Sequence, residues 1–308
     1  MTRQKRYHGV VVPAVTPLTE DFKLDQEALE KMFDNFYQHD ALPFVLGTTG
    51  EVASLPNDLK STYLKQAGLL KKEGTILYAG ISSNSLDDSI NYAKEAYDFG
   101  IDVVAVTIPS YYPLTENQTK RYFEQLADSI PLPLIIYNIP ATTHVSLPLT
   151  LIEELSYHDN IVGAKDSERS VERLRKSVEL WKNRTDFSHF MGWAAKSAEA
   201  LLLGSDGIIP STGNYMPSIY QEMQKAVWNG NVEKAYEMQK RSDFFGNLYQ
   251  GGRTLGESLW ALKVLMNESG LCKPIVMPPL QAQSEEEMLK LVELFNQLDI
   301  HNSVFVTA

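Results

Sequence analysis

The sequence predicts an α/β protein built as a (β/α)8 barrel. Short runs rich in apolar and β-branched residues alternate with longer amphipathic segments from about residue 8 to residue 228. Eight strand–helix units fit into this stretch, and about 220 residues is a suitable length for such a barrel. The expected strands are apolar throughout, which indicates a parallel sheet covered by helices on both faces.

The individual elements follow from these patterns. The expected strands are His8–Val15, Phe44–Gly47, Ile76–Ile81, Val103–Thr107, Leu134–Asn138, Ile161–Lys165, Phe187–Met191 and Gly207–Ile209. The expected helices between them are Gln26–Gln38, Asp58–Lys71, Leu86–Phe99, Glu116–Asp128, Pro148–Tyr157, Ser170–Lys182, Lys196–Leu203 and Ser218–Val227. Two of these helices begin at recognisable start signals, namely Pro56 with Asn57, and Ser85 with Asp88 three positions later.

A doubly wound open sheet is the structural alternative. It usually has fewer strands, and no Gly-x-Gly-x-x-Gly run follows any expected strand. We therefore expect a barrel catalytic domain over residues 1–228 and a C-terminal three-helix appendage over residues 229–308. The three helices of the appendage are expected at Lys234–Gly246, Leu255–Glu268 and Glu285–Leu298.

Composition excludes several classes of function. The 39 acidic residues outnumber the 28 Lys and Arg residues, and the net charge of −11 repels phosphate backbones, so no nucleic-acid partner is expected. No apolar stretch approaches the roughly 20 residues that span a bilayer, so no membrane partner is expected. Residues 1–8 are basic and polar with no apolar segment behind them, and Cys272 is the single cysteine. We expect no secretory signal, no internal disulfide and a cytoplasmic location.

The polar residues of the sequence show no motif for a metal or a cofactor. The six histidines show no metal-ligand spacing, and the chain has no His-Glu-x-x-His run. It also has no Gly-x-Ser-x-Gly elbow and no phosphate-binding loop. We expect neither a metal nor a cofactor.

Lys165 is the most informative residue, because it ends a short apolar run that begins after Asn160. Burial lowers the pKa of a lysine and frees its amine to act as a nucleophile, and the product with a keto acid is a Schiff base. The alternative is a lysine whose stem lies along the strand end while its amine reaches water.

Polar side chains follow several other strands, at the end of a barrel where catalytic groups lie. The turn at Gly47 offers backbone N–H groups and the hydroxyls of Thr48 and Thr49, which suit a carboxylate, although an ordinary loop is the alternative. Tyr137 is a candidate for proton transfer to and from a carbinolamine, with a core tyrosine as the alternative. The joint placement of these groups on one rim favours the catalytic interpretation.

These residues also carry a resemblance that spans nearly the whole chain. The chain resembles the pyruvate-dependent class I aldolases of the dihydrodipicolinate synthase / N-acetylneuraminate lyase family. The matching motifs are residues 13–17 (Pro-Ala-Val-Thr-Pro), 47–51 (Gly-Thr-Thr-Gly-Glu), 137–140 (Tyr-Asn-Ile-Pro) and 163–167 (Gly-Ala-Lys-Asp-Ser). The 28 positions that separate Tyr137 from Lys165 also fit the family.

The resemblance implies a TIM barrel, a homotetramer built as a dimer of dimers, and specific residue roles. Lys165 would form the Schiff base with pyruvate or another 2-keto acid, and Tyr137 would transfer protons. Thr48 and Thr49 would hold the keto acid's carboxylate and join a hydroxyl relay. Tyr111 falls where the family has a tyrosine lent across the tight-dimer interface, with Tyr112 beside it. The expected substrate-binding set is completed by Gly47, Thr142, Ser167, Gly192, Trp193, Ile209 and Ser211.

Departures from the family pattern argue against both namesake activities. Synthases that condense pyruvate with aspartate semialdehyde carry an arginine five residues after the tyrosine, where this chain has the neutral Thr142. Neuraminate lyases carry an Asp-Glu pair where this chain has Ala194 and Ala195. Ser167 and Ser211 fall where sugar-acid lyases contact substrate hydroxyls, and Trp193 is an addition of this chain that offers a flat apolar wall.

We therefore expect a lyase that joins pyruvate to an aldehyde or cleaves a 4-hydroxy-2-keto acid, of the 2-keto-3-deoxy sugar acid or hydroxy-oxoglutarate type. Dihydrodipicolinate synthesis proper and a keto-deoxy acid dehydratase are the enzymatic alternatives. The non-enzymatic alternative is a sensor that binds a keto acid.

Overall fold

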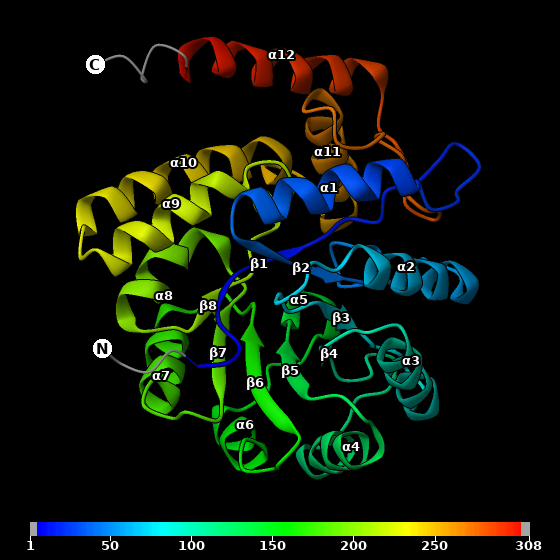
Figure 1. Cartoon of the computed structure of the whole chain (residues 1–308), viewed down its shortest axis with the longest axis vertical. Helices are drawn as coiled ribbons and strands as arrows, with labels where there is room; N and C mark the ends of the chain where they lie inside the picture. The colour runs from blue at the N-terminus through cyan, green and yellow to red at the C-terminus, as the bar shows by residue number, and fades with distance from the viewer. Residues whose placement is uncertain (1–4, 303–308) are drawn as a thin grey trace.

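The eight strands form a closed parallel barrel, as the sequence predicts. The computed structural model describes residues 5–302, with side chains described as far as residue 297. Strand order is β1 to β8 in sequence, with β8 pairing back to β1 (Figure 1). The strands are β1 (Gly9–Pro13), β2 (Ala41–Val45), β3 (Tyr78–Gly80), β4 (Val103–Val106), β5 (Leu134–Asn138), β6 (Ile161–Asp166), β7 (Ser188–Met191) and β8 (Gly207–Ile208).

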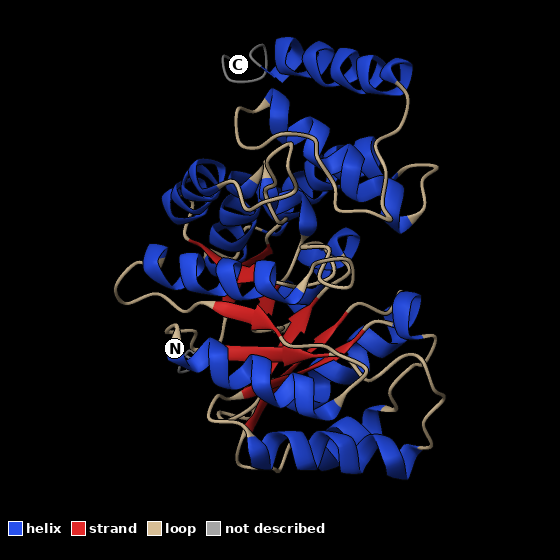
Figure 2. Ribbon diagram, turned by 90° about the vertical axis from the view of Figure 1, so that its right-hand side faces the viewer, coloured by secondary structure: helices blue, strands red, loops and turns tan. Residues whose placement is uncertain are grey.

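The helices enclose the barrel, and the last ones stack at one end of the molecule (Figure 2). Around the barrel lie α1 (Gln26–Gln38), α2 (Asn57–Leu70), α3 (Leu86–Asp98), α4 (Glu116–Ser129), α5 (Pro140–Thr143), α6 (Leu149–Leu155), α7 (Val171–Trp181), η1 (Ala194–Lys196), α8 (Ser197–Leu203), η2 (Ser211–Asn214) and α9 (Pro217–Trp228). The C-terminal helices are α10 (Val232–Gln250), α11 (Leu255–Glu268) and α12 (Glu285–Asn302).

The expected elements are present, and their limits differ for local reasons. Ser85 caps α3 by accepting a hydrogen bond from the Asp88 N–H, as its sequence signal predicts. The second strand begins at Ala41, three residues earlier than expected, because Pro43 interrupts its β-rich character. The short helix α5 was not expected, since four residues carry too little periodicity to be recognised.

The C-terminal region forms the three helices that the sequence predicts. Helix α10 packs against α8 and α9, and α11 packs against α10 and α12. The division of the chain between residues 228 and 229 stays a prediction. The outermost parts of the two expected domains, residues 1–4 and 303–308, lie outside the described residues.

Two apolar clusters build the core, one inside the barrel and one between the strands and the helices. The inner cluster includes Val11, Phe44, Tyr78, Phe190 and Ile209. Because side chains of a strand alternate between its two faces, the same strands supply Val10, Val12 and Val45 to the outer cluster. The barrel is therefore filled with side chains, and its chemistry is confined to the rim.

The pairing of β5 with β6 contains a register shift. Leu134 lies opposite Ile161, whereas the next residue, Ile135, lies opposite Gly163. The extra residue in β6 brings Tyr137 opposite Lys165. Without it, Tyr137 would lie opposite Ala164 and Lys165 would be displaced by one residue, so the shift sets the positions of both side chains.

Two buried ion pairs connect distant parts of the chain. The Lys5 Nζ lies 2.8 Å from Asp206 Oδ2 and also donates to the carbonyls of Trp181 and Phe187. The Lys263 Nζ lies 2.5 Å from Glu51 Oε1, and neither of these two side chains is exposed. Breaking a buried pair by removing one partner typically costs about 3–5 kcal/mol, because the other charge is left uncompensated.

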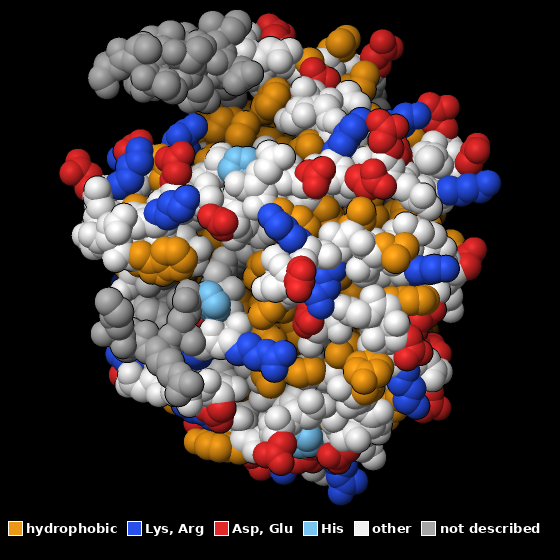
Figure 3. Space-filling view, viewed as in Figure 1, with side chains coloured by type: hydrophobic (Ala, Val, Ile, Leu, Met, Phe, Trp, Pro, Cys, Tyr) orange, Lys and Arg blue, Asp and Glu red, His pale blue; other side chains and the backbone are white. Residues whose placement is uncertain are grey.

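Charged side chains of both signs are interspersed on one face of the molecule (Figure 3). On the face that Figure 3 shows, Lys and Arg side chains lie among Asp and Glu side chains and form no continuous basic area. Within residues 5–302, no helix is both long enough and apolar enough to cross a membrane.

Candidate active site

Lys165 is buried on the inner side of β6, next to two aromatic rings. Its side chain is only 3% exposed. Its Nζ lies 3.8 Å from the centroid of the Tyr137 ring and 4.9 Å from that of Phe44. Burial lowers the pKa of Lys165, and the nearby Tyr137 opposes this effect only in part. The amine is therefore more readily available in its neutral, nucleophilic form than an exposed lysine is.

Tyr137 forms a pair with this lysine. The two residues lie opposite each other on β5 and β6, and Tyr137 is 5% exposed. Burial acts to raise the pKa of the Tyr137 phenol, but the charge of Lys165 and hydrogen bonds with Thr48, Lys165 and Ser167 together outweigh it and lower that pKa. A phenol made more acidic beside an amine of lowered pKa is suited to moving protons at that amine.

The turn after β2 brings two hydroxyls to the same rim. The Gly50 N–H donates to Gly47 O at 3.0 Å, and the Glu51 N–H donates to Thr48 O at 3.1 Å. Thr48 and Thr49 lie between these bonds and are partly exposed. Thr48 faces Tyr137, because its hydroxyl is one of the groups that lower the pKa of the phenol. The structure thus brings Lys165, Tyr137 and Thr48 together.

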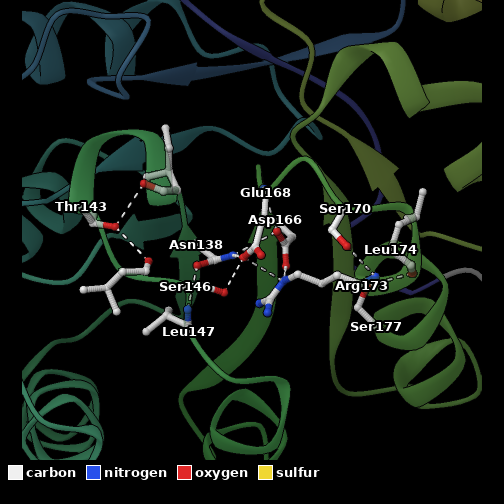
Figure 4. A network of polar contacts seen from close by, with 12 residues as sticks. Asn138, Thr143, Ser146, Leu147, Asp166, Glu168, Ser170, Arg173, Leu174 and Ser177 are labelled. Carbon is white, nitrogen blue, oxygen red and sulfur yellow. Dashed lines mark hydrogen bonds and ion pairs between the residues drawn. The ribbon is translucent and has the colours of Figure 1, made fainter.

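A polar network lies behind the lysine–tyrosine pair (Figure 4). Asn138 and Asp166 each follow one member of the pair, and side chains alternate along a strand, so their side chains point away from the barrel interior. The Asp166 Oδ1 accepts from Asn138 Nδ2 at 3.1 Å, and its Oδ2 accepts from Arg173 Nε at 2.6 Å. These bonds join the ends of β5 and β6 to α7 and hold the two strands in register.

The same network fixes the loop that carries Thr142. The Glu168 Oε2 accepts from Ser146 Oγ at 2.6 Å and from Asn138 Nδ2 at 3.1 Å, and the Leu147 N–H donates to Asn138 Oδ1 at 3.1 Å. Sequence analysis assigned no role to Asn138, Glu168 or Arg173. The sequence offers one signal for this network. Asn138 and Asp166 are polar residues that directly follow Tyr137 and Lys165, each at the end of an apolar strand.

A cavity of about 470 Å³ opens beside this group. Phe44 and Tyr137, the two rings that contact the lysine amine, lie in its wall, together with Gly47, Thr48 and Thr142. Further polar lining comes from Glu51, Ser54, Lys60, Ser82, Ser83, Asn84, Thr107, Ser110 and Thr143. Ser82, Ser83 and Asn84 are not among the site residues predicted from the sequence, although they also lie just beyond the carboxyl end of β3. Leu255, Leu259 and Leu280 close the cavity from the C-terminal region.

Lys165 and Thr49 are not among the residues that line this cavity, and within the described chain neither are the remaining expected residues at the ends of β6, β7 and β8. Ser167 Oγ lies so near Gly192 that a Cβ there would approach it to 2.1 Å. Ile209 is buried in the inner cluster, and Ser211 Oγ lies 2.7 Å from Tyr249 OH. Trp193 is half-buried, with Lys196 Nζ 5.8 Å from its ring centroid.

Tyr111 lies apart from the buried group. It is 75% exposed and contacts the ring of Tyr112 edge-on, with the centroids 4.9 Å apart. The Asn84 Oδ1 accepts hydrogen bonds from the Ser110 and Tyr111 N–H groups and so fixes the loop. Tyr111 does not line the cavity of its own chain, as far as the described residues show.

A second cavity, of about 390 Å³, lies at the opposite end of the barrel, beside the first residues of β1 and β2. That end of a barrel is associated with stability rather than with catalysis. Among residues 5–302, no group of three or more His, Cys, Asp or Glu side chains is arranged to hold a metal ion.

Comparisons with known proteins identify the family of this chain. The model of the dihydrodipicolinate synthetase family matches residues 6–298. A protein of Thermococcus kodakarensis described as an uncharacterized DapA-like lyase is 31% identical over 284 residues, which are 90% of this chain and 95% of that protein.

Two solved structures share the fold closely. Dihydrodipicolinate synthase from Bacteroides thetaiotaomicron is 28% identical, with a TM-score of 0.90 and coverage of 96% of this chain and 100% of that one. YagE from E. coli K12, a dihydrodipicolinic acid synthase family protein solved in complex with pyruvate, is 27% identical, with a TM-score of 0.87 and coverage of 96% and 99%. Taken with the barrel, its C-terminal helices and the buried lysine, these matches show that the chain belongs to the dihydrodipicolinate synthetase family of lyases.

Proposed function

We propose that this protein is a class I aldolase that forms a Schiff base between Lys165 and pyruvate. The observation that carries the proposal is the buried Lys165 amine, which lies against Tyr137 and has a lowered pKa. The pyruvate complex of the similar YagE protein supports the choice of keto acid. The family membership supports a lyase.

The proposed reaction begins with the attack of Lys165 Nζ on the keto carbon of pyruvate. The resulting carbinolamine loses water to give an iminium ion, and the loss of a methyl proton then gives an enamine. The enamine carbon attacks the aldehyde carbonyl, and water hydrolyses the new iminium to release a 4-hydroxy-2-keto acid and the free amine. Cleavage is the reverse of these steps. The iminium itself accepts the electron pair, so the chemistry of the carbanion is supplied by the lysine.

Tyr137, Thr48 and Thr49 have proposed roles around this intermediate. Tyr137 moves the protons that carbinolamine formation and dehydration require. The hydroxyls and backbone N–H groups at residues 47–50 hold the carboxylate of the keto acid. Support comes from the position of Thr48 beside the phenol, because a relay needs donors and acceptors in one chain of contacts.

The lining of the cavity supports an uncharged, hydroxylated aldehyde as the second substrate. Lys60 lies in the lining, where its Nζ is 5.2 Å from the centroid of the Tyr92 ring and burial lowers its pKa. Thr142 occupies the wall where a synthase would place its arginine, and the other polar groups of the lining are mainly serine and threonine hydroxyls and the Asn84 amide. Such groups bind hydroxyls well but cannot form a bidentate ion pair with a carboxylate. We therefore propose a 2-keto-3-deoxy sugar acid or a hydroxy-oxoglutarate-like acid as the 4-hydroxy-2-keto acid.

We also propose a homotetramer, built as a dimer of dimers, in which Tyr111 completes the site of a neighbouring subunit. The exposure of its ring, and a loop fixed by Asn84, support this role.

The first prediction concerns the covalent intermediate. Incubation with pyruvate followed by borohydride reduction is expected to give one adduct, located on Lys165 by peptide mass spectrometry. A Lys165→Met variant should give none, because no other nucleophile lies at this position. If wild-type protein formed no adduct with any of a panel of 2-keto acids and showed only reversible thermal stabilisation, the keto-acid sensor would replace the aldolase.

The second prediction concerns proton transfer. Tyr137→Phe is expected to lower kcat by about 10²–10⁴-fold, the usual contribution of a general acid–base group, with an unchanged circular dichroism spectrum. Tyr78→Phe is the matched control, because it removes another buried hydroxyl inside the barrel that has no hydrogen-bond partner among the described residues. Equal rates for wild type and Tyr137→Phe would remove Tyr137 from the mechanism.

The third prediction concerns the aldehyde. Wild-type protein should use a neutral hydroxyaldehyde with higher kcat/KM than an aldehyde of similar length that carries a carboxylate. Thr142→Arg should shift the ratio of the two kcat/KM values toward the carboxylate by about ten-fold or more, since a charge-assisted hydrogen bond contributes about 1.5–3 kcal/mol. Thr142→Gln adds length without charge and should leave the ratio unchanged. A wild-type preference for the carboxylated aldehyde would contradict the proposed substrate class.

The fourth prediction concerns the subunits. Light scattering after size exclusion should give the mass of four chains, and Tyr111→Phe should reduce kcat at least about ten-fold without changing that mass. Tyr112→Phe, one residue away, serves as the control and should retain activity. A fully active monomer would rule out a shared site.

A further inference from the structure

One buried ion pair joins the candidate site to the C-terminal region. Glu51 ends the turn that carries Thr48 and Thr49, and Lys263 lies in the middle of α11. Their charged atoms are 2.5 Å apart, and both side chains are fully buried. Such a pair excludes water and has a defined geometry, so it can fix the relative positions of the two segments.

The pair also holds a third segment, the stretch between α11 and α12. The Met277 N–H donates to Glu51 Oε2 at 2.6 Å, and the Lys263 Nζ donates to Ile275 O at 2.6 Å. Both carboxylate oxygens are thereby engaged, one by Lys263 and one by Met277. Glu51 lies in the cavity wall, but its carboxylate is turned to the C-terminal region and acts through the backbone of the turn.

The turn itself needs external support, because its two flanking residues adopt a conformation that only glycine adopts easily. Leu46 has φ of 54° and Glu51 has φ of 60°. Non-glycine residues at positive φ persist when surrounding contacts determine them, and such residues cluster at functional sites.

Contacts on the barrel side support only part of the turn. The Thr16 Oγ1 donates to Gly50 O at 2.6 Å, and Gly80 allows the close approach of Leu46, since a Cβ at Gly80 would lie 2.1 Å from Leu46 O. The side chain of Glu51 holds the Gly50 end of the turn from the opposite side, because its partners come from the C-terminal region.

We propose that Glu51 and Lys263 are positioning residues that hold Thr48 and Thr49 in place to bind the carboxylate of the keto acid. The C-terminal helices are then a part of the binding machinery rather than an appendage. This inference rests on the proposed function in one respect, namely that Thr48 and Thr49 bind that carboxylate.

The test compares two double variants that each replace a buried ion pair by neutral side chains. Glu51→Gln/Lys263→Met removes the pair beside the turn. Lys5→Met/Asp206→Asn removes the pair that ties the N-terminal segment to β7 and β8 and lies away from the cavity. Both variants should unfold at a lower temperature than wild type. The Lys5→Met/Asp206→Asn variant therefore controls for the effect of lost stability.

Two readouts then separate positioning from general stability. In the first variant, the pyruvate concentration that gives half-maximal borohydride trapping on Lys165 should rise at least ten-fold, while the maximal trapping rate changes less than three-fold. Hydrogen exchange at the Gly50 and Glu51 amides should become at least ten-fold faster. The Lys5/Asp206 variant should change neither quantity. If Glu51→Gln/Lys263→Met does not fold, the single variant Glu51→Asp, which keeps both charges but shortens the side chain that reaches the Met277 N–H, is measured in the same way.

The inference is overturned if the Glu51/Lys263 variant loses thermal stability but keeps the wild-type half-maximal concentration and exchange rates. Failure of the proposed function has a different signature, because wild-type protein itself would then form no adduct. In that case, the exchange rates still decide whether the ion pair orders the turn, and unchanged rates would reject the pair as its support.

Discussion

The site depends on excluding water from the Lys165 amine while the Tyr137 phenol stays beside it. Desolvation favours the neutral form of Lys165, and the amine in turn makes the Tyr137 phenol more acidic, so each group adjusts the proton affinity of the other. This relation holds only while Nζ stays within a few ångströms of the ring. The register shift in β6, the outer network around Asp166 and the turn after β2 all contribute to that single distance.

Local patterns in the sequence predict the barrel well, because each strand–helix unit carries its own periodicity and its own start signals. The ends of the strands follow from the same patterns, and they place Lys165, Tyr137 and Thr48 on one rim. The register shift could not be predicted, because the apolar patterns of β5 and β6 are the same whether or not one extra residue follows the Leu134–Ile161 pair.

Contacts between distant segments also could not be predicted from the sequence. Lys263 lies inside an apolar run of α11, from Leu259 to Met266, which indicates that it is buried but does not identify its partner. Glu51 follows a turn in which a carboxylate would normally be solvated. Their pairing becomes visible only when the C-terminal region is placed against the barrel.

The outer network around Asn138, Asp166 and Arg173 has a consequence for how new activities arise on this scaffold. It joins the ends of β5 and β6 to α7 (Figure 4). On the cavity side, Ser82 Oγ accepts a hydrogen bond from the Thr107 N–H and Ser83 Oγ accepts one from the Ser85 N–H, so these two residues also support their loops. A directed-evolution library confined to Ser110 and Thr142 would search for altered aldehyde preference while leaving these supports and the positions of Lys165 and Tyr137 in place.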